Sequence, residues 1–285
     1  MSQSAPSPAR FLACDAFVTA AAYAGRVAAL GLGDGTVRLI RDDAEELSVA
    51  AHDGAVLSLA AHGAGLVSGG DDGRLVHIAF DGAVTELFKA RGKWIEHVAV
   101  SPASGALVCS VGKEALAWAK GGTEPRRFAH ATTVTGLAFH PKGKRIAASH
   151  YNGVTLWWLG AENATGAALD WKGSHTGVWW HPGGDFIVTS MQENALHGWR
   201  LSDKQHMRMA GYPAKIKSMA FFNKGKWLAT AGAESVICWP FDGKGPMGRN
   251  AREVGPQAER GLHPLDLRPW SALDGRFEEG GVLPG

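Results

Sequence analysis

Twelve histidines are the most numerous side chains in this sequence that could do chemistry near neutral pH, because imidazole both transfers protons and binds metals. His140, His181 and His263 each precede a proline and fall on a common 41-residue step, which places them in equivalent turns of different units. The chain has no H-x-H, no HExxH and no Cys/His cluster at metal-ligand spacing. We therefore predict no metal site and no cofactor.

Motifs for nucleophilic or phosphate chemistry are equally weak. No G-x-S-x-G nucleophile turn occurs. The stretch "GLGDGT" at 31–36 resembles a glycine-rich phosphate loop, but a strand pattern follows it where a phosphate loop needs the N-terminus of a helix. The sequence thus predicts a turn at this stretch and a protein that is not an enzyme.

The spacing of the tryptophans indicates which elements position these residues. Trp118, Trp158, Trp199 and Trp239 end similar short runs at steps of 40, 41 and 40 residues, and Ile78 and Ile40 continue the series towards the N-terminus. A period of about 40 residues indicates a repeat architecture such as a propeller or solenoid. We therefore interpret the four tryptophans as packing residues between neighbouring sheets rather than as ligand-stacking residues.

Each repeat contains short strands separated by turns. In "VTGLAFHPKGKRIAASHYNGVTLWWL", three apolar runs are separated by a Pro/Gly turn and by an Asn-Gly turn, which is a strong hairpin signal. Helical periodicity is absent, so the fold class is all-β. The first strands of six repeats are predicted to begin at Val18, Val56, Ile95, Val134, His175 and Ile216.

The pattern resembles the WD-repeat β-propeller family. The family has a His before the first strand, matched by His52 and His130, and a Ser/Thr on the second strand, matched by Ser68 and Thr189. Its turn Asp is matched by Asp34 and Asp72, with Asn152 and Glu193 as weaker substitutes, and its Trp by the four strand-end tryptophans, none of which is followed by Asp. No repeat holds the complete His-Ser-Asp-Trp set, so we expect apolar packing to hold most repeats together.

The resemblance implies a seven-bladed β-propeller of four-stranded antiparallel blades, the seventh degenerate or incomplete. We expect an N-terminal segment at 1–14, six WD-like repeats at 15–247, and a degenerate seventh blade or tail at 248–285. In this family an N-terminal strand commonly closes the ring, and residues 10–15 are the candidate for it.

The resemblance also implies a partner-docking face, because residues just before each first strand lie on the narrow top of such propellers. The residues that it places there are Phe17, Lys93, Trp94, Trp171, Lys172, His175, Tyr212 and Lys215. Trp94 and Trp171 are not explained by the strand-end position, and aromatic residues beside cations make good interface anchors. Packing over a blade edge explains these two tryptophans about equally well.

Composition limits the function classes. The net charge of +2 gives little reason to expect nucleic-acid binding, and no secretory signal or membrane span is visible. Three widely spaced cysteines suit a reducing cytoplasm. We expect a non-enzymatic cytoplasmic scaffold that binds a protein or peptide, acidic if the three lysines mark the site. A small-ligand binder or enzyme at the channel mouth using His175 is the first alternative, and nucleic-acid binding is the second.

Overall fold

The computed structural model of the chain describes residues 12–41, 45–161 and 164–255. Within these ranges the protein consists of 22 β-strands and the turns that join them. None of these residues belongs to a helix that is long and apolar enough to cross a membrane. The prediction of an all-β fold is therefore confirmed.

The strands form five antiparallel sheets, and in each sheet neighbouring strands are consecutive in the chain. The first sheet contains β1 (Val18–Ala24), β2 (Val27–Leu32), β3 (Thr36–Ile40) and β4 (Glu46–Ala50). The second contains β5 (Val56–His62), β6 (Gly65–Gly70), β7 (Arg74–Ala79) and β8 (Val84–Lys89). The third contains β9 (Val98–Val100), β10 (Leu107–Val111), β11 (Glu114–Trp118) and β12 (Arg126–Ala129).

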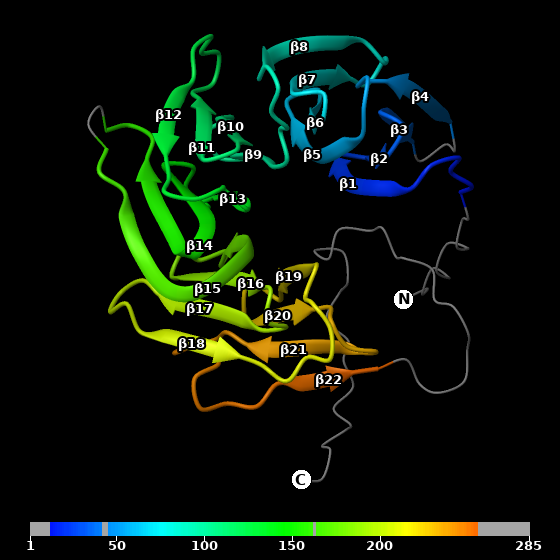
Figure 1. Cartoon of the computed structure of the whole chain (residues 1–285). Helices are drawn as coiled ribbons and strands as arrows, with labels where there is room; N and C mark the ends of the chain where they lie inside the picture. The colour runs from blue at the N-terminus through cyan, green and yellow to red at the C-terminus, as the bar shows by residue number, and fades with distance from the viewer. Residues whose placement is uncertain (1–11, 42–44, 162–163, 256–285) are drawn as a thin grey trace, which may run out of the picture.

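The fourth sheet has six strands, namely β13 (Gly136–Phe139), β14 (Arg145–Trp158), β15 (Ala167–Trp180), β16 (Phe186–Met191), β17 (Leu196–Arg200) and β18 (His206–Met209). The fifth contains β19 (Met219–Phe222), β20 (Trp227–Thr230), β21 (Val236–Pro240) and β22 (Arg252–Val254). The sheets form an arc around a common centre, with β1, β5, β9, β13 and β19 towards the inside and β4, β8, β12, β18 and β22 towards the outside (Figure 1).

The prediction of seven four-stranded blades is wrong for the described residues, which form five sheets. The fourth sheet accounts for two of the six repeats. β15 has 14 residues and runs without interruption from the outer position of the fourth repeat to the inner position of the fifth. A strand replaces the loop that would separate two blades, so two repeats share one sheet.

Glycines close the turns at the top of the sheets where no side chain fits. Gly73 in the "DDGR" turn has φ +75, and a Cβ on it would lie 2.2 Å from the carbonyl oxygen of Ala90. Only glycine combines a left-handed backbone with such a close approach of another chain segment. This turn therefore depends on its glycine for both reasons.

The core lies between neighbouring sheets. Val37 and Leu39 of the first sheet form one buried cluster with Leu66 and Ile78 of the second. Later clusters join the other sheets in the same way, because alternate residues of each strand face the neighbouring sheet. The arc is held by apolar side chains packed from sheet to sheet.

The predicted ends of the repeat array are only partly described. β22 pairs with β21, so residues 252–254 complete the fifth sheet, while the prediction of a degenerate seventh blade falls mainly on residues 256–285, outside the described part. Of the predicted closing strand at 10–15, the described residues are not in a strand. Leu12 and Cys14 pack instead with Ala16 against the first sheet.

Candidate interaction face

The top face, as we use the term, consists of the turns before each first strand and the turns between each second and third strand. Because neighbouring strands are antiparallel, these two sets of turns lie at the same end of every sheet. Asn152, where the register of β14 shifts, and the segment around Trp171 belong to this face. Trp158 lies at the opposite end of its strand.

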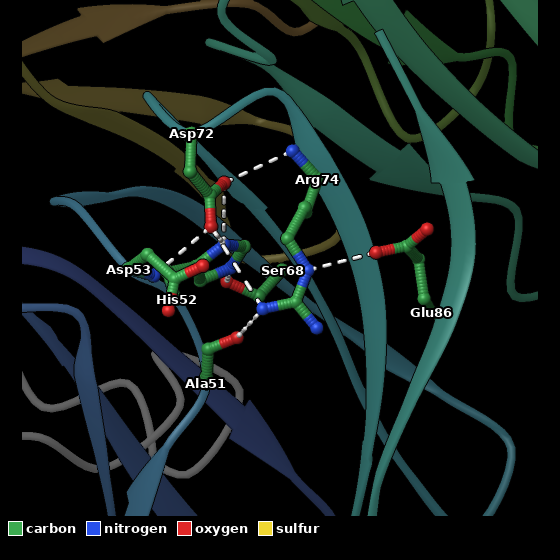
Figure 2. A network of polar contacts seen from close by, with 7 residues as sticks. All are labelled: Ala51, His52, Asp53, Ser68, Asp72, Arg74 and Glu86. Atoms are coloured by element: carbon green, nitrogen blue, oxygen red, sulfur yellow. Dashed lines mark hydrogen bonds and ion pairs between the residues drawn. The ribbon is translucent and has the colours of Figure 1, made fainter. Parts of the chain in front are cut away.

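A polar network organises the top of the second sheet, as Figure 2 shows. His52 Nε2 lies 2.8 Å from Ser68 Oγ, and His52 Nδ1 lies 3.0 Å from Asp72 Oδ1. The backbone N–H groups of Asp53 and Arg74 donate to the Asp72 carboxylate at 3.0 and 2.9 Å. Burial alone would raise the pKa of Asp72, but these backbone hydrogen bonds and the contact with His52 outweigh it and lower the pKa. The network fixes the turn that leads into β5.

The order Ser68–His52–Asp72 is that of a hydrolase triad, yet it cannot act as one here. Ser68 is fully buried within β6 and His52 is 6% exposed, so no substrate carbonyl can reach the Ser68 hydroxyl. The hydroxyl and carboxylate instead satisfy the two nitrogens of a buried imidazole. This arrangement is structural.

Arg74 extends the network to the outer strand. Its Nε donates to Glu86 at 2.9 Å, and Nη1 donates to the carbonyl oxygen of Ala51 at 3.3 Å (Figure 2). These bonds tie β7 and β8 to the segment before β5. Ile78 occupies the tryptophan position of this repeat and cannot donate a hydrogen bond.

Other repeats keep different parts of this network. In the fourth repeat the indole N–H of Trp157 donates to His130 Nε2 at 3.0 Å, while Trp158 is 49% exposed. The structure therefore places Trp157, which is half-buried, and not Trp158 in the position of the repeat tryptophan, a correction to the sequence interpretation. Alternation along β14 turns one of two adjacent tryptophans inward, and the one-residue choice could not be made from spacing alone.

In the last sheet, tyrosine takes the position of the histidine. The indole N–H of Trp239 donates to the Tyr212 hydroxyl at 2.6 Å, and this hydroxyl lies 2.6 Å from Thr230 Oγ1. Tyr212 is 7% exposed, and burial raises its pKa. The prediction that Tyr212 binds a partner is therefore wrong, because its polar end is used inside the sheet.

In the fifth repeat, an aromatic column replaces the network. Trp171 stacks on His197 with ring centroids 4.0 Å apart and 17° between planes. His175 is fully buried, with Nδ1 2.8 Å from Thr189 Oγ1 and Nε2 2.9 Å from the carbonyl oxygen of Trp171. His175 cannot contact a partner or line a channel mouth, which corrects both predictions for it.

A shallow depression of about 580 Å³ lies beside this column on the top face. Its lining residues are Tyr151, Asn152, Asp170, Trp171 and Lys172. Tyr151 is 50% exposed and Trp171 is half-buried, so the lining combines two aromatic rings with a carboxylate and an ammonium group. Asn152, with φ +71, accepts a hydrogen bond from the N–H of Gly173 at 3.3 Å and joins the two strands. Aromatic surface beside charge suits a peptide or protein side chain.

The remaining predicted face residues are exposed. Trp94 is 58% exposed and Phe17 is 90% exposed. The exposed cations of the predicted set are Lys93, Lys172 and Lys215. The structure thus presents six of the eight predicted residues to solvent fully or in part, and buries His175 and Tyr212.

Tyr151 is the residue that the sequence analysis missed. It stands in the "HYNG" stretch, which the sequence predicts to be a turn between the second and third strands and which lies within β14, whereas only positions before first strands were considered. Because both kinds of turn lie at the same end of a sheet, the antiparallel strand order was the signal that could have found it.

The predicted structural positions behave as follows. Asp34 Oδ1 accepts a hydrogen bond from the N–H of Thr36 at 3.0 Å, as Asp72 does from Arg74. Trp118 and Trp199 are buried at 7% and 3% exposure, and Trp118 packs edge-on against Phe88.

Within the described residues, no group of three or more His, Cys, Asp or Glu side chains could hold a metal ion. Cys109 is fully buried, and burial raises the pKa of its thiol to about 12, so its reactive thiolate is not populated near neutral pH.

The stretch that contains the Trp157–His130 hydrogen bond matches a known protein family. The WD40 family, described as "WD domain, G-beta repeat", matches residues 122–158. These residues include β12 and β14, and the repeat they define recurs through the arc of antiparallel sheets. The chain is a WD-repeat β-propeller.

No protein of curated description matches the sequence. WD-repeat propellers are typically protein-interaction scaffolds and usually not enzymes, and they generally bind protein partners.

Proposed function

We propose that this WD-repeat protein is a non-enzymatic scaffold that binds a protein or peptide on its top face, with the depression between Tyr151 and Trp171 as the anchor site. The observation that carries the proposal is the depression itself, in which two aromatic rings flank Asp170 and Lys172. Large aromatic residues dominate the binding energy of protein interfaces because they bury much area at small entropic cost.

The charge of the exposed lysines supports an acidic partner. Lys93, Lys172 and Lys215 are exposed, and among the described residues none of them has an ion-pair partner in the structure. Unpaired ammonium groups at an interface rim raise the association rate of an acidic partner. Asp170 lies inside the depression, so the acidic groups of the partner would contact the lysines around it rather than its floor.

We further propose that the protein acts in the cytoplasm. Cys14, Cys109 and Cys238 are all unpaired in the structure, and free thiols persist in reducing compartments.

The test is affinity capture with the wild type, a double variant of the top face and a control variant at the opposite end of the sheet. The double variant Trp94→Ala/Tyr151→Ala removes exposed aromatic side chains of the top face, and Trp158→Ala removes one of similar exposure at the opposite end of the sheet. We expect the top-face variant to lose a specific partner that the Trp158→Ala control retains. Equal loss or equal retention would contradict the proposal, provided that circular dichroism shows both variants to be folded.

The charge component has its own test. Lys172→Glu with Lys215→Glu should weaken binding of the captured partner at low salt, and Lys172→Gln with Lys215→Gln should weaken it less. Unchanged affinity in the glutamate variant would show that the partner is not acidic at this face.

A further inference from the structure

Arg145 packs against two tryptophan rings at the end of the fourth sheet that lies opposite to the top face. Its guanidinium carbon is 5.4 Å from the ring centroid of Trp158, the last residue of β14, and 5.7 Å from that of Trp180, the last residue of β15. Arg145 itself begins β14, and the two ends of this strand come together because the N–H of Leu159 donates to the carbonyl oxygen of Lys144 at 3.1 Å. A guanidinium is attracted to indole faces, so both rings hold the charge of Arg145 in place.

The ring of Trp180 is itself held in position. Its indole N–H donates to the carbonyl oxygen of Ala138 at 3.1 Å, and the residue is 8% exposed. The His140 ring packs edge-on against Trp180 with ring centroids 4.7 Å apart, and His140 Nδ1 accepts a hydrogen bond from the N–H of Lys142 at 3.0 Å. Trp180 is therefore the fixed ring of the pair, whereas Trp158 is 49% exposed.

The charge of Arg145 has no partner among the residues that the structure describes. Its Nε is buried without a hydrogen-bond acceptor, and no described carboxylate lies within ion-pair distance of the guanidinium. Three other arginines, whose side chains are 22%, 22% and 15% exposed, each contact a carboxylate oxygen, at 2.7, 2.9 and 2.5 Å; they are Arg38, Arg74 and Arg200. Burial lowers the pKa of Arg145, whereas a nearby carboxylate would raise it. A partly buried charge without a counter-ion is costly to the fold, which indicates that an anion from outside pairs with it.

Cations outnumber acids around Arg145. Burial lowers the pKa of His140, and the charges of Arg145 and Lys142 lower it further, so both cations lie close to this ring. Among the described residues, Asp185 is the one acid that acts on His140 in the opposite direction. Lys142 and Lys144 are exposed, and neither has an ion-pair partner in the described part of the chain. Three cations against one carboxylate create a positive potential that attracts anions.

The loop that follows β14 leads toward the third sheet. Leu159 and Ala164 both pack in the buried cluster that contains Phe128 of β12. Trp180 belongs to a different buried cluster. Packing of the loop against β12 therefore directs it away from the guanidinium and from the fixed tryptophan ring.

We propose that Arg145 binds a phosphate group, as free phosphate or in a small organic ester. The guanidinium presents planar N–H donors that match the oxygens of a phosphate in a bidentate contact, and such charge-assisted hydrogen bonds are short and strong. A phosphate that uses two oxygens in this way has another oxygen for Lys142 or Lys144, whereas a carboxylate has none. The half-exposed Trp158 ring gives the organic part of an ester an apolar surface. Because this site and the top face lie at opposite ends of the sheet, its ligand is distinct from the protein partner proposed above.

Isothermal titration calorimetry with the full chain tests this proposal, in a buffer free of phosphate and with inorganic phosphate, phenyl phosphate and benzoate as probes. We expect both phosphates to bind, and phenyl phosphate to bind at least about tenfold more tightly than benzoate. Arg145→Met keeps an apolar side chain against the rings and should weaken phosphate binding at least about tenfold. Lys142→Met should weaken it less, and Lys224→Met, the matched control, should leave it unchanged. Lys224 is exposed in the equivalent turn of the last repeat, where Trp227 stands in place of the arginine.

The relative affinities distinguish the possible ligands. Tighter binding of phenyl phosphate than of inorganic phosphate would identify an organic ester, and equal or weaker binding would identify free phosphate. No binding of either phosphate, benzoate binding as tight as that of phenyl phosphate, unchanged affinity in Arg145→Met, or an equal loss in Lys224→Met would overturn the proposal. If Arg145→Met is unfolded by circular dichroism, Arg145→Lys keeps the charge but loses the bidentate fork, and a phosphate affinity equal to that of the wild type would then count against the site.

Discussion

Tyr212 and Trp239 share a hydrogen bond of 2.6 Å inside the last sheet, and the same Tyr212 hydroxyl reaches Thr230 at 2.6 Å. This set takes the place of the histidine network at His52. The phenol of Tyr212 bonds the hydroxyl of Thr230 as the imidazole of His52 bonds the hydroxyl of Ser68. In both cases, a buried polar group of the second strand is satisfied by a ring from the segment before the first strand. The top-face turn is therefore tied to the interior of its sheet.

Tyr212→Phe should destabilise the protein without affecting partner capture. The change leaves the Trp239 indole N–H and the Thr230 hydroxyl without their shared partner, and an unsatisfied buried polar group costs about 1–3 kcal/mol. Urea unfolding followed by circular dichroism measures the loss. Tyr151→Phe is the control and should change the free energy of unfolding by less than about 0.5 kcal/mol, since Tyr151 is half exposed. Equal stability of both variants would show that the Tyr212 hydroxyl is not used as described.

Adjacent tryptophans of β14 should respond very differently to truncation. Trp157→Ala removes a ring whose centroid lies 5.0 Å from that of Phe128 and whose N–H donates to His130. This change should lower the free energy of unfolding by at least about 2 kcal/mol. Trp158→Ala removes a ring that is 49% exposed and lies 5.4 Å from the Arg145 guanidinium, and it should cost about 1 kcal/mol or less. Thermal unfolding of the two variants decides the point. A larger loss for Trp158→Ala would restore the assignment made from repeat spacing.

The sequence predicted those features that depend on period. Alternating apolar runs, the Asn-Gly pair and the 40-residue step were enough for the fold class and for the starts of β1 and β5, because these patterns follow from local backbone geometry. The strands β9, β13 and β19 begin two or three residues after the predicted Ile95, Val134 and Ile216, and the predicted start at His175 lies inside β15. The number of sheets depends on whether the chain forms a loop or stays extended near Trp171. That choice is made by pairing of Gly153 with Asp170 and of His175 with Met191, which no local pattern reveals.

The candidate site shows the same division. Exposure of Trp94, Lys93 and Lys215 followed from their position before a first strand. The burial of His175 and Tyr212 did not, because each ring turns inward to a threonine, Thr189 or Thr230, some 14 or 18 residues away in sequence. Side-chain direction at a turn is set by such distant partners rather than by the turn sequence.

Lowering the pH should destabilise the protein at pH values well above those at which carboxylates titrate. Burial lowers the pKa of His97 and His130 to about 4 and that of His197 to about 3, with neighbouring histidines adding to the effect at His130 and His197. Below the ordinary value of about 6.5 the unfolded chain takes up protons that the folded chain refuses. Stability should therefore be full above pH 6.5 and fall as the pH is lowered to about 4, by about 1.4 kcal/mol per pH unit for each histidine that remains neutral in the folded state.

His197→Phe tests this origin. Neither ring nitrogen of His197 has a hydrogen-bond partner in the structure, and the ring is fully buried against Trp171, so phenylalanine keeps the stacking and removes the titration. Free energies of unfolding measured from pH 7.5 to 4 should decline less steeply in the variant, with equal or greater stability at pH 7.5. His206→Phe removes one of the neighbouring groups that lower the pKa of His197, and it should reduce the slope by less than His197→Phe does. A slope that His197→Phe does not alter would assign the acid sensitivity to other groups.

The junctions between repeats should be intolerant of a single added methyl group. Gly31→Ala places a Cβ 2.5 Å from Val56 Cγ1 and 3.2 Å from Leu59 Cδ1, so the second sheet must move away from the first, and overpacking of this kind costs about 1–3 kcal/mol. Gly33→Ala is the matched control, because the nearest atom to its added Cβ is 3.7 Å away. Chemical unfolding should show a loss for the first variant and a change within about 0.5 kcal/mol for the second. Pairing Gly31→Ala with Val56→Ala should recover part of the loss, since the smaller side chain makes room for the new methyl group. If the double variant instead loses the sum of the two single losses, the Val56 side chain does not pack against Gly31.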